Sequence, residues 1–123
     1  MTKKYKGWYV MTFLSRLFRG KYNTISGSKL DNFLNNNNIL ILDVRRVEEF
    51  RSGHIPNAKN IPVGELSSRL SELNSYKDSK IIVYCAVGVR SAKAADILVK
   101  NGFNDVYNLS GGISSYKGKL NRK

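Results

Sequence analysis

The chain has 123 residues, 41% of them hydrophobic, and this length suits one globular domain rather than two. Its single cysteine excludes an internal disulfide, a Cys-x-x-Cys redox pair and a multi-cysteine zinc site, and so favours a reducing, cytoplasmic location. The formal charge is +12, but residues 1–24 carry six of the lysines and arginines and no acidic residue. No RNA- or DNA-binding motif accompanies this charge, so we expect small anions or an acidic protein as partners and no nucleic acid.

Residues 1–21 form a basic N-terminal extension in which apolar side chains recur at helical spacing. The apolar stripe consists of Val10, Phe13, Leu14 and Leu17. This spacing predicts an amphipathic helix. The stretch is too short to span a membrane, which takes about 20 apolar residues. We expect the helix to dock on the domain, and peripheral binding to an anionic membrane surface is the alternative.

Residues 22–119 form the domain, and a short basic tail, residues 120–123, follows it. Strands are predicted at 22–26, 39–42, 60–62, 80–84 and 103–109, with the one at 60–62 on an edge because it contains a proline. Helices are predicted from Ser28, as N-cap, to Asn35, at 47–52, around Leu66, Leu70 and Leu73, at 91–100, and around Tyr116. The alternation predicts an α/β fold with a small, mainly parallel sheet and helices on both faces.

The only cysteine, Cys85, stands where an apolar strand ends and a tight loop leads into a helix. The first amides of a helix lack internal acceptors and lie at the positive end of its dipole, so a thiol placed there should ionise below its usual pKa of about 8.5. The loop amides can turn inward as an anion nest, and Gly88 permits the backbone angles that this curl needs. We therefore predict that Cys85 is a nucleophile. The loop residues predicted to bind substrate or the negative charge on sulfur are Ala86, Val87, Gly88, Val89 and Arg90.

Two charged residues, Asp43 and Arg45, follow a buried apolar strand. The carboxyl ends of parallel strands share one edge of a sheet, which brings both residues to the side of Cys85. They either orient the catalytic loop or simply pin the strand end by bonding to each other or to backbone. His54, the only histidine, is interpreted as a loop residue bonded to backbone, because the helix dipole and Arg90 already account for a thiolate. A lone histidine without clustered carboxylates predicts no metal site.

Four short blocks of sequence follow one another in an order typical of one enzyme family. They are Asp43-Val44-Arg45 with Glu48-Glu49-Phe50, the run from Gly53 to Pro62, the run from Val83 to Ser91, and the run from Leu109 to Ile113. Over roughly residues 22–119 these blocks resemble the rhodanese family of sulfurtransferases. The resemblance implies a small α/β domain and a persulfide on the loop cysteine, with no cofactor or metal. It also places Asp43, Arg45 and Ser91 around the catalytic loop.

The chain departs from the pattern of that family at two points. Tyr116 stands where tryptophan is frequent, a change that we expect to alter packing only. The side chains at positions 86, 87 and 89 are uncharged, so Arg90 is the only charged residue of the loop, whereas many members carry a second basic residue there. This departure predicts weak binding of thiosulfate.

The expected activity is transfer of sulfane sulfur, carried as a Cys85 persulfide, from a small anionic donor such as thiosulfate to a thiol or protein acceptor. One alternative is a cysteine-based phosphatase or arsenate reductase. Related phosphatase loops run Cys-x5-Arg, whereas this loop is Cys-x4-Arg, which narrows the cradle and favours a sulfur atom. The other alternative is a non-catalytic binding module with the basic tail as its partner surface, against which the presence of Cys85, Gly88 and Arg90 argues.

Overall fold

The computed structural model describes residues 21–34 and 38–122. The predicted N-terminal helix and its docking therefore lie outside the described residues, apart from Lys21. Within the described ranges, none of the helices has the length and apolar character needed to cross a membrane.

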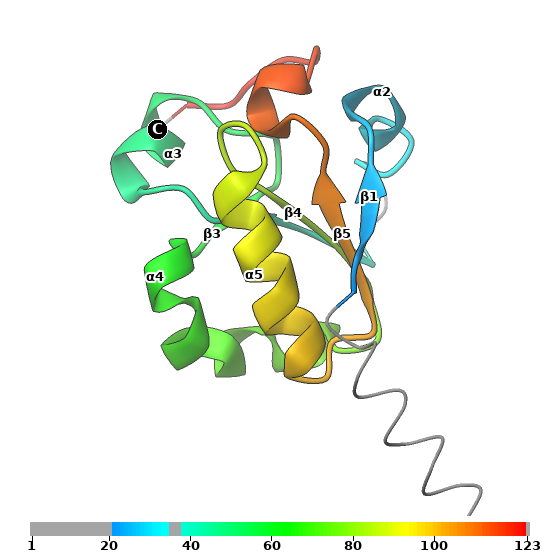
Figure 1. The fold of residues 1–123 in the computed structure, drawn as a ribbon. Helices are drawn as coiled ribbons and strands as arrows, with labels where there is room; N and C mark the ends of the chain where they lie inside the picture. The colour runs from blue at the N-terminus through cyan, green and yellow to red at the C-terminus, as the bar shows by residue number, and fades with distance from the viewer. Residues whose placement is uncertain (1–20, 35–37, 123) are drawn as a thin grey trace, which may run out of the picture.

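Five parallel strands form one sheet in the order β1-β5-β4-β2-β3 (Figure 1). Their bounds are β1 (Asn23–Ile25), β2 (Ile39–Asp43), β3 (Lys59–Asn60), β4 (Lys80–Tyr84) and β5 (Asp105–Leu109). Each predicted strand is present to within two residues, and the short proline-flanked strand lies on an edge as expected. The predicted α/β class with a parallel sheet is confirmed.

The helices are α2 (Gly27–Leu30), α3 (Val47–Ser52), α4 (Val63–Leu66), the 3-10 helix η1 (Ser67–Tyr76), α5 (Val89–Lys100) and the 3-10 helix η2 (Gly112–Ser115). The prediction of a helix capped by Ser28 and running to Asn35 is wrong. Ser26 is the N-cap and α2 ends at Leu30. The reason lies in a contact distant in sequence, because Gly27 has no side chain and its backbone approaches Ser115, which starts the helix earlier.

The helix predicted around Leu66, Leu70 and Leu73 is divided into α4 and η1. Arg69 leaves helical geometry there, with φ −119° and ψ 16°, and its guanidinium bonds to the carboxylates of Glu65 and Glu72. The helix predicted to start at Ser91 begins two residues earlier, because Gly88 takes φ +109° and serves as the N-cap of α5. Arg90 therefore belongs to the first turn of a helix.

The strands alternate between two apolar layers, as the period of two in a β-strand requires. Ile81 and Val83 of β4 join the layer under α4, η1 and α5, whereas Ile82 and Tyr84 join the layer covered by α2 and η2. Cys85 continues the first series. The alternation thus places the cysteine at the end of the central strand, in the same apolar layer as the buried residues of α5. Figure 1 shows α5 lying across one face of the sheet.

The chain leaves β2 and β4 in opposite directions across the sheet. From β2 it passes to β3 on one side, and from β4 it passes to β5 on the other. Such a switch point opens a crevice at the carboxyl ends of the two strands, which is where ligands bind in open α/β sheets. The loop from residue 85 to residue 90 and the segment that leads into α3 face each other there.

Candidate active site

The Cys85 sulfur lies at the base of the loop, with donors around it. The amide of Gly88 lies 3.1 Å from Sγ, the amide of Ser91 lies 3.3 Å from it, and the Ser91 hydroxyl oxygen lies 3.4 Å from it. The residue as a whole is 1% exposed. Because the amides belong to the N-terminus of the 12-residue helix α5, the dipole of that helix adds to the attraction for negative charge.

These surroundings shift the ionisation of the thiol. Burial acts to raise the pKa of Cys85, but the thiolate is stabilised by the Ser91 hydroxyl when its proton turns to the sulfur, and by the amides of Ser91, Gly88 and Val87. Together the hydrogen bonds outweigh burial, and the pKa of Cys85 is lowered. The thiolate is the nucleophilic form of cysteine, so the loop prepares Cys85 for attack.

The loop amides point inward because two carbonyl groups at the start of the loop accept hydrogen bonds from η2. The Cys85 carbonyl accepts a hydrogen bond from the Ile113 amide (2.9 Å), and the Ala86 carbonyl accepts one from the Ser114 amide (3.3 Å). Gly112 makes this possible, since its φ is +63° and a Cβ there would lie 2.5 Å from the carbonyl oxygens of Cys85 and Ala86. The sequence analysis had singled out this stretch only as part of the run from Leu109 to Ile113.

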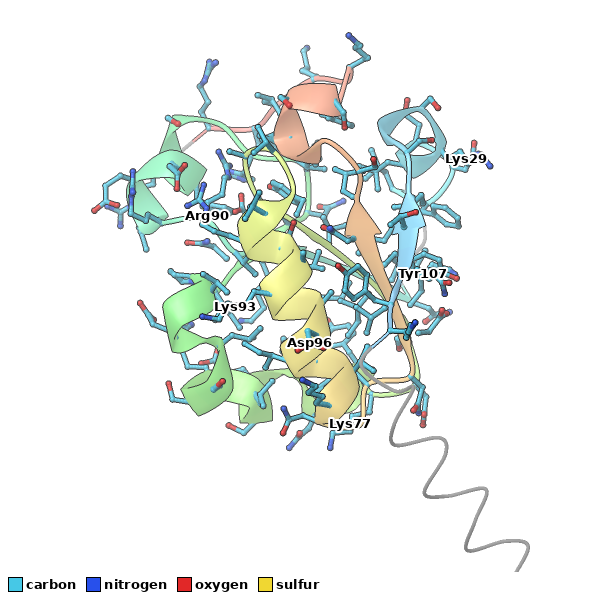
Figure 2. All side chains as sticks on the ribbon, viewed as in Figure 1. Lys29, Lys77, Arg90, Lys93, Asp96 and Tyr107 are labelled. Carbon is cyan, nitrogen blue, oxygen red and sulfur yellow. The ribbon has the colours of Figure 1, made fainter. Side chains whose placement is uncertain are left out.

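The Arg90 side chain extends from the first turn of α5 toward α3 (Figure 2). Its guanidinium forms two hydrogen bonds with the Glu49 carboxylate, at 2.8 and 3.0 Å. The Arg90 hydrogen bond is the main reason why the pKa of Glu49 falls to about 2, and Glu49 in turn raises the pKa of Arg90. The sequence analysis assigned the positive charge of Arg90 to binding the anion. In the structure Glu49 largely compensates that charge, and sequence reasoning missed this partner.

Asp43 and Arg45 form a buried ion pair of 2.7 Å at the end of β2. Arg45 also donates to the Gly53 carbonyl (2.7 Å), and the Tyr84 hydroxyl accepts the Ile55 amide (3.1 Å). These bonds fasten the segment after α3 to the sheet. Of the two interpretations that the sequence left open, the geometry favours the one in which Asp43 and Arg45 pin the strand end.

His54 bonds to backbone, as predicted. Its Nδ1 lies 2.9 Å from the Phe50 carbonyl oxygen, and its ring stacks on the Phe50 ring at 3.7 Å. The backbone of His54 pairs with Asn121, which brings the C-terminal segment against the end of α3. Among the described residues, no group of three or more His, Cys, Asp and Glu side chains is placed to hold a metal ion.

Ser91 touches the sulfur, and behind it lies Asn108, a residue that the sequence analysis did not select. The Ser91 hydroxyl donates to Asn108 Oδ1 at 2.6 Å, and Asn108 Nδ2 donates to the Gly88 carbonyl at 3.2 Å. Asn108 is 8% exposed and belongs to β5. A polar side chain at an inward position of a central strand was the available signal.

Residues 26–119 match the sequence profile described as the Rhodanese-like domain. The chain belongs to this family. The family and the parallel sheet are those that the resemblance implied.

Two curated relatives are much longer than this rhodanese-like chain. The putative sulfur carrier protein YrkF of Bacillus subtilis is 42% identical over 79 residues, which make up 64% of this chain and 42% of that protein. The tRNA uridine(34) hydroxylase of Buchnera aphidicola is 36% identical over 96 residues, 75% of this chain and 31% of that protein. The chain thus spans less than half of either relative.

Solved structures of single rhodanese-like domains match over nearly their whole length. A rhodanese-like domain protein from Staphylococcus aureus has a TM-score of 0.73 and 37% identity, covering 82% of this chain and 98% of that one. The human single-domain sulfurtransferase TSTD1 has a TM-score of 0.67 and 26% identity, covering 77% of this chain and 95% of that one. The match to a sulfurtransferase supports a rhodanese-family enzyme.

Proposed function

We propose that this protein is a sulfurtransferase in which Cys85 carries sulfane sulfur as a persulfide. The observation that carries the proposal is the position of the buried Cys85 sulfur, within 3.1 to 3.4 Å of the Gly88 amide, the Ser91 amide and the Ser91 hydroxyl. Such a site stabilises a thiolate and, after transfer, an anionic persulfide. A single cysteine kept as a free thiol supports a reducing, cytoplasmic location.

The reaction has two steps. The Cys85 thiolate attacks the sulfane sulfur of a donor such as thiosulfate, an S–S bond forms, the donor's S–S bond breaks, and sulfite leaves with the electron pair. The outer sulfur of the persulfide then carries the negative charge and faces the mouth of the loop. A thiolate acceptor attacks that sulfur, and Cys85 leaves as the thiolate with which the cycle began. Every group in these steps comes from the chain, the donor or the acceptor.

The character of the loop bears on donor and acceptor. Arg90 is engaged by Glu49, so the loop offers little free charge to a dianion. Val87 and Val89 are 63% and 74% exposed at the mouth of the loop, where apolar surface is available to a partner. These features support weak binding of thiosulfate and a protein thiol with apolar neighbours as the acceptor. The basic tail and residues 1–21 are further surfaces that could bind an acidic partner. For residues 1–21, binding to a membrane surface is less favoured than docking on the domain.

A cysteine-based phosphatase is supported less well. In that chemistry the loop arginine must face the phosphoryl oxygens, whereas Arg90 here turns to Glu49 on α3. A non-catalytic binding module would not need three hydrogen-bond donors around a buried thiol. A role in tRNA hydroxylation belongs by name to a relative of which the match covers 31%, so most of that protein lies outside the match and the name supports no such role for this chain.

Intact-mass analysis tests the proposal. Wild-type protein incubated with thiosulfate and desalted should gain about 32 Da, the mass of one sulfur atom, and lose it on adding cyanide. Cys85→Ser should gain nothing and should not turn over. An equal gain on Cys85→Ser, or rapid hydrolysis of aryl phosphates by the wild type without any sulfur adduct, would contradict the assignment.

A further inference from the structure

The thiol, Ser91, Asn108 and Gly88 form a closed ring of hydrogen bonds inside the domain. Sγ lies 3.4 Å from the Ser91 hydroxyl, that hydroxyl lies 2.6 Å from Asn108 Oδ1, Asn108 Nδ2 lies 3.2 Å from the Gly88 carbonyl, and the Gly88 amide lies 3.1 Å from Sγ. Ser91 is 0% exposed and Asn108 is 8% exposed, so bulk water is not a ready substitute for a missing partner.

The Ser91 hydroxyl has one proton to donate, and two acceptors compete for it. In the thiol form, Cys85 donates its S–H to the Ser91 oxygen and Ser91 donates to Asn108, so every polar group in this chain of bonds is satisfied. In the thiolate form, sulfur needs the Ser91 proton. If Ser91 turns to the sulfur, the Asn108 oxygen loses its donor in a buried place, and if it stays, the lone pairs of Ser91 face the anion.

We propose that Asn108 is a positioning residue that opposes ionisation of Cys85 by holding the Ser91 hydroxyl toward itself. Asn108 therefore raises the pH needed to form the thiolate, against the effect of the helix amides. The ring of hydrogen bonds also affects the free thiolate and the persulfide of a sulfur carrier differently. Once Sγ is bonded to a second sulfur, the charge lies on the outer atom, and Ser91 can keep its bond to Asn108. This second consequence rests on the proposed function, whereas the effect on ionisation does not.

Other charged and titratable groups surround the site, from α5, α3, β2 and β4. They are Arg90, Glu49, Asp43, Arg45 and Tyr84. Arg90 is paired with Glu49, Asp43 is paired with Arg45, and the Tyr84 hydroxyl accepts a hydrogen bond from the Ile55 amide. None of these bonds involves Asn108, so a change at position 108 leaves them in place. A shift in thiol reactivity on such a change therefore reports on the ring.

The test is the pH profile of Cys85 alkylation by iodoacetamide, measured on the full-length chain. Asn108→Leu removes the competing acceptor at similar volume, so on the acid side of the profile the alkylation rate should rise about three- to tenfold. Asn108→Asp keeps an acceptor and adds negative charge, so the rate there should fall. Ser91→Ala removes the hydroxyl through which Asn108 acts, and its rate is the reference for the double variant. In Ser91→Ala/Asn108→Leu the leucine should have no further effect, because Asn108 acts through Ser91.

A merely structural role for Asn108 predicts a different pattern. Leu and Asp both lose the bond from Nδ2 to the Gly88 carbonyl, so loosening of the loop would slow alkylation in both variants. Slower alkylation of Asn108→Leu, or an equal effect of the leucine with and without the Ser91 hydroxyl, would overturn the proposal. Asn108→Ala gives the same test should the leucine variant not fold. Asn104→Leu is the control. Asn104 is exposed and directly precedes the first residue of β5, at the end of the strand away from Cys85, so this variant should be alkylated like the wild type.

Discussion

Replacing Glu49 with glutamine tests whether the ion pair with Arg90 limits the binding of a small anionic donor. The guanidinium lies 2.8 and 3.0 Å from the two carboxylate oxygens, so its charge is compensated within the pair. Glu49 also accepts the backbone amide of Arg46 at 2.9 Å, at the N-terminus of α3. Glutamine retains an oxygen for that amide and removes the negative charge. Arg90 is then released toward a dianion bound at Cys85.

The size of the expected change in affinity for the donor follows from the solvent exposure of the Arg90–Glu49 pair. The side chains of Arg90 and Glu49 are 33% and 24% exposed, so solvent screens the released charge. A fully desolvated, charge-assisted hydrogen bond contributes about 1.5–3 kcal/mol, whereas exposed ion pairs contribute about 0.2–1 kcal/mol. We take about 1 kcal/mol for this partly buried pair, and since about 1.4 kcal/mol is tenfold, that is about fivefold in affinity. The KM for thiosulfate should fall about fivefold in Glu49→Gln.

Steady-state formation of thiocyanate from thiosulfate and cyanide measures this change. Glu48→Gln is the matched control, because it makes the same change in net charge on the same helix at an exposed position. Glu48→Gln should change KM much less, and the effect of Glu49→Gln should shrink as salt is raised. An equal fall of KM in both variants, or no fall in Glu49→Gln, would refute the argument that the pair withholds Arg90 from the donor.

The Arg90–Glu49 pair also makes the stability of the protein depend on pH. Arg90 lowers the pKa of Glu49 from 4.5 to about 2. A carboxyl group whose pKa is lowered in the folded state contributes stability that is fully present above its unfolded pKa and is lost as the pH falls through its folded pKa. The difference in melting temperature between wild type and Glu49→Gln should therefore be constant above about pH 5 and should disappear toward pH 2, as a thermal melt at each pH would show.

Two further predictions concern the support of the loop and the N-terminal extension. Gly112→Ala should lower stability by roughly 1–3 kcal/mol and slow the alkylation of Cys85, because its Cβ would strike the backbone of Cys85 and Ala86 at a residue with φ +63°. Gly64→Ala, which meets nothing within 4 Å, is the control for the thermal melt, and equal melting temperatures of the two variants would contradict the reasoning. Deletion of residues 1–21 should lower the melting temperature while activity on a small donor survives. Salt-sensitive binding to anionic vesicles that disappears on deletion, with an unchanged melting temperature, would favour the membrane alternative.

Local patterns were enough to predict the strands and the place of Cys85 at the end of β4. The apolar runs that become β2 and β4, and the helix-forming run after Cys85, are properties of neighbouring residues. The helix ends were harder to predict, because they depend on contacts outside the helix. Gly27 begins α2 because its backbone lies against Ser115, and Arg69 interrupts a helix while holding carboxylates on either side of it.

The partner of Arg90 could not be predicted from the sequence, since Glu49 is 41 residues away and on another helix. Their meeting depends on β4 lying beside β2, which brings the turn before α5 against α3. Glu48 and Glu49 are equivalent in composition and in helix propensity, and only the direction of α3 decides which of them pairs with the loop. The strand order therefore decides how much of the positive charge of Arg90 is available to a substrate.

Asn108 is a different case, because the sequence did contain its signal. In β5 the residues at 106 and 108 face the same layer as Ile81 and Val83 of β4, and the parallel register places Asn108 directly beside Val83. Val83 precedes Cys85 by two residues and so points to the same side. A polar side chain at that inward position would be unfavourable unless it were hydrogen-bonded, and the polar groups within reach of it belong to the loop that holds the sulfur. An asparagine in an otherwise apolar series, one strand away from a reactive cysteine, is thus explained by the bond it makes behind that cysteine.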